Sequence, residues 1–120
     1  MARKEHGWTI KGYRTPRGEA VVRTYIDGLE DEARKSVYSY LTYCRKHGPW
    51  WNPEKIKKLS GEIYELRPTS QVRLFGFFHP SEDKTFVITH GFTKKTSRVP
   101  RREINKAEER RKTLVERSER

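Results

Sequence analysis

The sequence predicts an α+β protein in which an N-terminal strand and a helix pair pack on a mainly antiparallel, twisted sheet that is followed by a C-terminal helix. Three observations predict this class. Apolar residues recur at helical spacing near the N-terminus, the middle holds three β-type runs joined by turn residues, and a second helical stripe lies near the C-terminus. We expect one domain over residues 1–120, with elements in the order β-α-α-β-β-β-α.

The N-terminal elements follow from alternation and from helix stop signals. Residues 8–13 alternate between apolar or small and polar side chains, which predicts a short strand. Residues 21–26 carry apolar side chains at helical spacing. A second helix is predicted from about Glu30, where acidic side chains favour a helix N-terminus, to the basic residues before Gly48.

The middle of the chain changes to a β-type pattern. Residues 62–67, 71–79 and 84–92 are rich in aromatic and β-branched side chains, and turn residues around Pro68 and Pro80 separate them. Three strands joined by such short loops predict an antiparallel meander.

The C-terminal region predicts a basic amphipathic helix over about residues 100–117. After Pro100, apolar side chains at Ile104, Ala107 and Leu114 fall on one helical stripe, and arginine and lysine residues surround that stripe.

The charge of the chain favours a polyanionic partner. The 120 residues hold 27 Lys and Arg against 16 Asp and Glu, a formal net charge of +11. Residues 1–32 are balanced and residues 93–120 carry +6, so the positive field is expected on the sheet and the C-terminal third. Nucleic acid, a phosphate-rich surface or an acidic protein fits such a field.

Several classes of protein are excluded by the sequence pattern. No stretch approaches the roughly 18 apolar residues of a membrane span, and no apolar segment follows the charged start, so we expect no membrane association and a cytoplasmic location. The single cysteine, Cys44, supplies no disulfide or cysteine-based zinc site, and its position on a helical apolar stripe predicts a small core residue. Motifs typical of metal, nucleotide or nucleophilic-serine sites are absent from the sequence, and we expect no metal and no cofactor.

The strand pattern gathers a candidate phosphate site. Alternation places Tyr64 and Leu66 of one strand, and Val72 and Leu74 of the next, toward the helices. This leaves Arg67, Arg73 and Phe75 on the opposite, exposed concave face. Two guanidinium groups beside an aromatic ring suit a phosphate and its attached base. The alternative is a solvated sheet on which Glu65 forms an ordinary salt bridge with an arginine.

Lysine and histidine residues are further candidates. Lys94 and Lys95 follow the last strand, and one of the two is expected to enter the site, while a solubilising basic loop is the alternative. Lys57 and Lys58 have the same two interpretations. His90 in the last strand is a candidate for proton transfer, although a structural role is more common for a single strand histidine.

Six blocks of sequence occur in a recognisable order, namely Tyr13–Gly18, Lys57–Gly61, Gly61–Arg67, Val72–Phe78, Ile88–Thr96 and Val99–Ile104. Together they resemble, over about residues 8–115, the phage-derived Gp49-like proteins, which are HigB-type toxins of the RelE/ParE toxin–antitoxin superfamily.

The resemblance implies a RelE-like fold and a ribosome-dependent mRNA endonuclease that inhibits translation. The implied chemistry is metal-free transphosphorylation, in which the RNA 2′-OH attacks its adjacent phosphate. The implied partners are mRNA, the 70S ribosome and a cognate antitoxin of the HigA-like, helix-turn-helix type.

The resemblance also implies roles for the candidate residues. Arg67 and Arg73 would hold the phosphate, Lys94, Lys95 or His90 would handle a proton, and Phe75 would stack a base. Five further cations would follow the RNA backbone, namely Lys57, Lys58, Arg98, Arg101 and Arg102.

The pattern departs from relatives in two places. Some RelE relatives use a C-terminal tyrosine as base, but the last tyrosine here is Tyr64. Some HigB relatives use an acid and a histidine near the last strand, and here only His90 is near, with no acid beside it. The alternatives to the nuclease are a ParE-like inhibitor of DNA gyrase and a non-catalytic basic module that binds nucleic acid.

Overall fold

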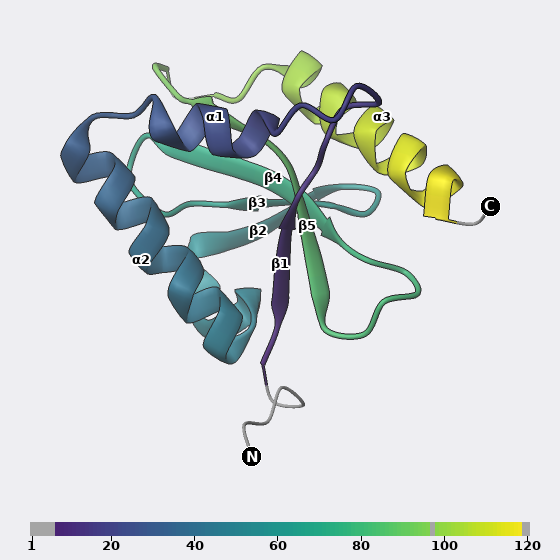
Figure 1. Cartoon of the computed structure of the whole chain (residues 1–120). Coiled ribbons are helices and arrows are strands. Elements are labelled where there is room, and N and C mark those ends of the chain that lie inside the picture. Colours follow the sequence, from purple (N-terminus) through teal and green to yellow (C-terminus); the bar gives the residue numbers. More distant parts are fainter. Residues whose placement is uncertain (1–6, 97, 119–120) are drawn as a thin grey trace.

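The computed structural model describes residues 7–96 and 98–118, which form a five-stranded sheet between two helical layers (Figure 1). The elements in chain order are β1 (Thr9–Gly12), α1 (Val21–Asp27), α2 (Asp31–His47), the 3-10 helices η1 (Pro49–Trp51) and η2 (Pro53–Lys55), β2 (Ile56–Ser60), β3 (Ile63–Leu66), β4 (Val72–Phe78), β5 (Thr85–Thr93) and α3 (Arg101–Ser118).

The sheet confirms the predicted meander and adds a strand to it. The strand order is β1-β5-β4-β3-β2, in which β3, β4 and β5 are antiparallel neighbours. The first strand pairs in parallel with β5, the last strand in the chain, with Thr9 opposite Thr85. Strand β2 was not predicted, because the adjacent exposed residues Lys57 and Lys58 hide its alternation. Lysines are common on edge strands such as this one, where they discourage pairing with another chain.

Helix α2 forms as its end signals predict. Asp31 and Glu32 occupy its first turn, and three basic residues occupy its last turn. Gly48 then takes a φ of 90°, a conformation that favours glycine, and its N–H donates to the carbonyl of Cys44. The apolar side of the helix, including Val37 and Cys44, is buried, so the predicted core role of Cys44 is confirmed.

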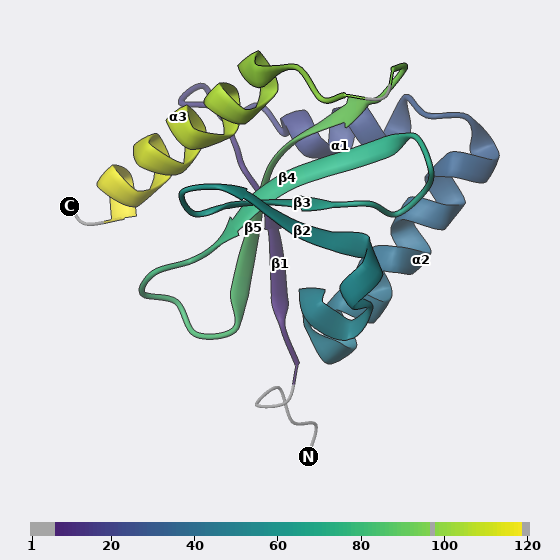
Figure 2. The same cartoon turned by 180° about the vertical axis from the view of Figure 1, so that it is seen from behind.

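Two hydrophobic cores lie on the two faces of the sheet. Figure 2 shows the helices on either side of it, with α1 and α2 on one side and α3 on the other. Helices α1 and α2 cover one face, where they bury Leu66, Val72 and Leu74, as predicted. Helix α3 covers part of the other face, with Ala107 fully buried over Phe75 and Phe77.

This second core corrects one prediction. Arg73 and Phe75 do lie on the face opposite α1 and α2, but that face is not open there, because α3 packs on it. Arg73 is only 5% exposed and Phe75 is fully buried. The sequence of the C-terminal helix is polar and positively charged, and this pattern does not by itself indicate which surface the helix covers.

No helix in residues 7–96 and 98–118 combines the length and the hydropathy that a membrane crossing requires.

A β-bulge between β4 and β5 shapes the centre of the sheet. Phe75 lies opposite His90 and Gly76 lies opposite Ile88, so Thr89 is the extra residue. The Thr89 hydroxyl donates to the carbonyl of Phe75 over 3.1 Å. At Gly76 the backbone lies so close to β5 that an added Cβ would be 2.3 Å from the Val87 carbonyl oxygen.

We therefore expect Gly76→Ala to lower the free energy of unfolding by about 2–3 kcal/mol, because backbone would have to move to admit the methyl group. Urea unfolding of the variant measures this. Gly28→Ala is the matched control, since its added Cβ would meet only ordinary contacts at 3.5 Å and beyond. Equal stabilities of the two variants would contradict the assigned packing at Gly76.

Candidate functional site

The candidate site lies on the α3 side of the sheet, where the strand register lines up several of the candidate side chains. Lys57, Glu65, Phe75 and His90 are cross-strand partners in one row from β2 to β5. Cross-strand partners share a face, so these four residues belong to one surface.

Glu65 joins the two arginines that the sequence singled out. Its buried carboxylate, 3% exposed, lies 2.5 Å from Nε of Arg67 and 3.6 Å from Nε of Arg73. The two guanidinium groups are therefore held near each other by one shared counter-charge. We call Glu65, Arg67 and Arg73 the arginine site.

The two arginines differ in how they are held. Nη1 of Arg73 donates to the carbonyls of Thr69 and Val72, and burial lowers the pKa of this guanidinium while the charge of Glu65 opposes that effect. The side chain of Arg67 is 37% exposed. Arg67 is therefore partly open to solvent, while the guanidinium of Arg73 is held in a fixed, buried position.

A histidine–carboxylate pair lies at the other end of the row. Nε2 of His90 is 3.0 Å from a carboxylate oxygen of Glu103, and both residues are buried. The expectation of no acid beside His90 was wrong, because Glu103 comes from the first turn of α3 and not from the last strand. Only the packing of that helix on the sheet brings the two groups together, so the sequence around His90 holds no signal for it.

The surroundings of the pair set its charge. Burial lowers the pKa of His90 to about 4, against the opposing effect of Glu103. Nε of Arg102 and Nζ of Lys106 lie 3.6 and 3.9 Å from the Glu103 carboxylate and balance its charge. Burial therefore favours the neutral imidazole of His90 at neutral pH, with Nε2 at hydrogen-bond distance from Glu103 and Nδ1 3.1 Å from the Thr89 hydroxyl.

The dilysine follows β5 directly. The backbone N–H of Lys94 donates to the carbonyl of Gln71 over 2.7 Å, which continues the β4–β5 pairing beyond Thr93. Alternation then places Lys94, which is half-buried, on the face of the arginine site, and the exposed Lys95 on the other.

The remaining cations divide between two surfaces. Lys57 pairs with Glu65 and shares its face, whereas Lys58 pairs with Tyr64 and lies on the opposite face. Arg101 and Arg102 are exposed at the start of α3, over the site's edge, and Arg98 is exposed in the loop before it. The predicted backbone-following cations therefore do not form one continuous track.

The prediction that the ring of Phe75 stacks a base is wrong. Phe75 is fully buried and stacks on the ring of His90, with 4.9 Å between centroids, so it presents no face to a ligand. Phe92 was missed. It lies opposite Arg73 on β5 and packs against the second core while remaining only partly buried, so part of this residue is exposed beside the arginine site. Aligning β4 and β5 as an antiparallel pair across their connecting turn would have placed Phe92 opposite Arg73 from the sequence.

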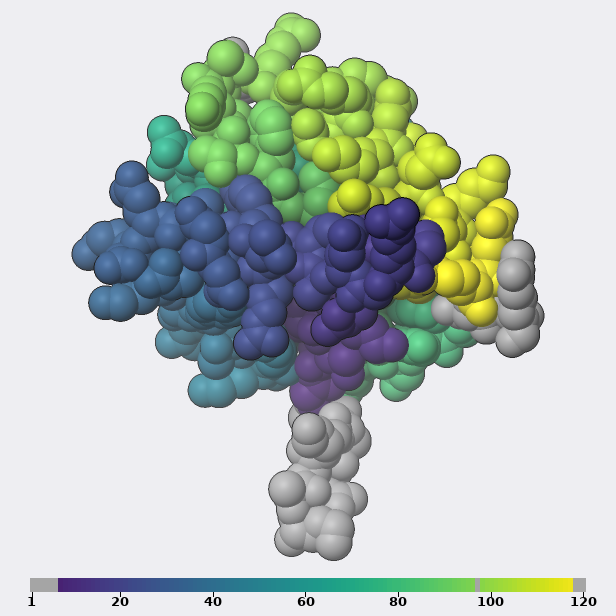
Figure 3. All heavy atoms as spheres, turned by 45° about the horizontal axis from the view of Figure 1, so that its top comes forward, coloured from purple at the N-terminus to yellow at the C-terminus, as the bar shows by residue number. Residues whose placement is uncertain are grey.

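A cavity of about 810 Å³ lies elsewhere, along β1. Its walls come from α1, α2 and the C-terminal half of α3, and its lining includes Ile10, Val22 and Leu114. The segment of residues 13–20 also contributes to the lining, and Nη2 of Arg117 donates to the carbonyl of Arg14 in it. In Figure 3 the dark segment that leads into α1 lies next to the yellow α3. Within the described residues, no group of three or more His, Cys, Asp or Glu side chains is placed to hold a metal ion.

Comparison with known proteins identifies the family. The family model described as phage derived protein Gp49-like (DUF891) matches residues 24–112, well over half of the chain. The chain belongs to this family. The match confirms the Gp49-like resemblance drawn from the sequence motifs.

The fold has a solved counterpart. A chain of the toxin–antitoxin complex RelBE2 from Mycobacterium tuberculosis superimposes with a TM-score of 0.53 at 15% identity, covering 76% of this Gp49-like chain and 95% of that chain. This confirms the predicted RelE-like α+β fold. No curated protein sequence gives a significant match.

The buried pair generates a prediction about acid stability. Because the pKa of His90 is lowered from its ordinary value of 6.5 to about 4, the unfolded chain binds the extra proton first as the pH falls. The contribution of the neutral His90 to the free energy of unfolding is fully present above pH 6.5. It is lost progressively as the pH falls to about 4, by an amount on the order of 3 kcal/mol. Urea unfolding between these pH values should show a steeper loss for the wild type than for His90→Gln.

The exposed His47 on α2 provides the control. His47→Gln should keep the wild-type difference between the two pH values, because that ring is not buried against the sheet. Parallel pH profiles for the wild type and His90→Gln would contradict a buried neutral imidazole.

Proposed function

We propose that this Gp49-like protein is the toxin of a toxin–antitoxin system and cleaves mRNA on the ribosome. The observation that carries the proposal is the convergence of Arg67 and Arg73 on one face of a basic protein, beside the partly exposed Phe92. Family membership and the fold shared with a chain of RelBE2 support it. A toxin that acts only by contact with a protein target needs no such phosphate-binding arrangement.

The proposed reaction is an internal transfer at phosphorus. The RNA 2′-oxygen attacks the adjacent phosphate, the bond from phosphorus to the 5′-oxygen breaks, and a 2′,3′-cyclic phosphate remains. The proton of the 2′-OH must leave, and the departing 5′-oxygen must gain one. Negative charge increases on the phosphate oxygens during the reaction, where fixed guanidinium groups stabilise it best.

The residues divide these tasks according to their exposure. Arg67 contacts the phosphate, and Arg73 stabilises the developing charge from its buried position. Lys94 is the proton-transferring side chain that we favour, because it lies on the site's face and is not fully buried. His90 acts as a positioning residue, since its Nε2 is engaged by Glu103 beneath α3.

The proposal includes an antitoxin as protein partner. The chain's net charge of +11 favours an acidic segment of that partner wherever it covers the basic surfaces.

Purified translating ribosomes test the nuclease directly. We expect primer extension to show cuts within the A-site codon for the wild type, and a loss of about a hundredfold or more in cleavage rate for Arg67→Ala, in line with the removal of a charge-stabilising donor. Arg23→Ala is the control, because Arg23 is an exposed arginine on α1, beyond the opposite face of the sheet.

A 2′-deoxy sugar at the scissile nucleotide should abolish cleavage by the wild type. Cleavage of that substrate would exclude attack by the 2′-OH. Absence of cuts together with growth inhibition in cells would favour a protein target such as DNA gyrase. If the wild type neither cleaves mRNA nor inhibits growth, the protein is a non-catalytic nucleic-acid-binding module.

Phe92 should matter for cleavage more than for folding. Phe92→Leu keeps an apolar side chain against the second core but removes the flat ring beside Arg73, so we expect reduced cleavage with less than about 1.5 kcal/mol lost in stability. Ribosome cleavage and urea unfolding of the same preparation measure both effects. Wild-type cleavage by this variant would show that no base stacks at Phe92.

A further inference from the structure

An exposed aromatic side chain lies on the face of the sheet opposite the arginine site. Trp50, in η1 after α2, is 51% exposed. Such exposure is high for tryptophan, which has the largest side chain and is usually well buried. Its ring stacks on Phe78 with 5.9 Å between centroids and 7° between planes, and meets Tyr64 edge-on at 5.5 Å. We call Trp50, Tyr64 and Phe78 the aromatic platform.

The platform is rigidly supported from below. Phe78 makes edge contacts with Tyr64 at 5.1 Å and with Phe86 of the core at 5.0 Å. Trp8 packs against Phe78 at 5.7 Å from the side. The indole of Trp50 is therefore fixed in orientation while half of its surface remains in water, which is the arrangement of a stacking surface and not of a core residue.

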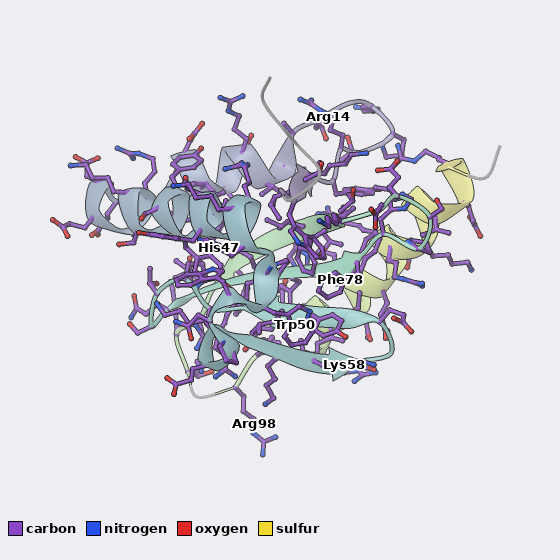
Figure 4. The ribbon with its side chains drawn as sticks, turned by 90° about the horizontal axis from the view of Figure 1, so that it is seen from below. Arg14, His47, Trp50, Lys58, Phe78 and Arg98 are labelled. Atoms are coloured by element: carbon purple, nitrogen blue, oxygen red, sulfur yellow. The ribbon has the colours of Figure 1, made fainter. Side chains whose placement is uncertain are left out.

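Positive charge accompanies these rings. Nζ of Lys58 lies 5.9 Å from the Tyr64 ring centroid, and Figure 4 shows Lys58, Trp50 and Phe78 grouped on one side of the molecule. The segment of residues 43–58 that carries Trp50 holds five Lys and Arg against one acid. At the far side of Phe78, the charge of Glu82 is matched by Lys11 at 2.6 Å.

The platform and the arginine site are connected over the edge of the sheet. β2 is the edge strand, and its neighbouring residues Lys57 and Lys58 point to opposite faces, the first toward Glu65 and the second toward Tyr64. A polyanionic chain that leaves the arginine site and crosses β2 therefore meets a lysine on each side of that edge.

We infer that Trp50 stacks an unpaired base of single-stranded RNA, and that Lys58 contacts the adjoining phosphate. A flat, supported ring next to lysines fits a nucleotide, because every base offers a π-face and the lysines bind phosphate without sequence preference. A protein partner is a poorer fit, since lysine is depleted in protein interfaces. The choice of RNA over DNA rests on the proposed function.

Binding of an uncleavable RNA tests this inference separately from catalysis. The ligand is a fluorescently labelled 12-nucleotide 2′-O-methyl RNA, titrated at several salt concentrations. We expect Trp50→Ala to weaken binding at least about fivefold and Trp50→Phe to retain most of the affinity. Lys58→Gln should weaken binding and reduce the salt slope by about one.

Two controls separate stacking from general charge attraction. Tyr38→Ala removes another exposed aromatic side chain, on the cavity side of α2, and should leave affinity unchanged. The same loss for an RNA duplex or for heparin as for the single strand would overturn the inference, because neither presents an unpaired base.

A spectroscopic readout addresses Trp50 itself. RNA should quench tryptophan fluorescence of the wild type, and this quenching should be lost in Trp50→Phe. Unchanged RNA affinity in Trp50→Ala overturns the inference whatever the ribosome assay shows. Lack of ribosome cleavage by the wild type would remove the proposed function while leaving these binding results interpretable.

Discussion

The buried carboxylate of Glu65 is the constraint on which the candidate site depends. Two guanidinium groups repel each other, and burying one of them is costly unless an opposite charge is nearby. Glu65 supplies that charge from the centre of β3, within the same face and within reach of both arginines. The protein therefore presents Arg67 to solvent from a fixed base, and the cost is that part of its positive charge is neutralised in advance.

The candidate site also depends on the packing of helix α3. It covers the sheet next to the arginine site, fills the second core with Ala107, and delivers Glu103 to His90. A helix that completes the core and also contributes to the site couples the two, so the arrangement around His90 exists only when α3 is docked. This dependence explains why the histidine–carboxylate pair belongs to the folded protein and to no local motif.

Much of the fold followed from the sequence because local signals agreed with one another. The spacing of apolar residues, the acids near Glu30 and the stop at Gly48 all indicated α2, and alternation assigned Leu66 and Leu74 to the correct face. The misses were non-local. The edge strand β2 has no apolar face to reveal it, Phe75 is buried by a helix that follows 23 residues after its strand ends, and Glu103 meets His90 only through packing. Sequence alternation places a residue on a face, but exposure on that face depends on what else packs there.

The parallel pairing of β1 with β5 has a consequence for how the molecule is made. Thr9 finds its partner only at Thr85, so the N-terminal strand has no place in the sheet while the ribosome is still translating the middle of the chain. Contacts of such high sequence separation form late and slow folding. The antiparallel strands that carry the arginine site lie closer together in sequence and can associate first. The pairing of β1 with β5 therefore joins residues that are translated first to residues that are translated late, and the sheet cannot be completed until β5 has emerged from the ribosome.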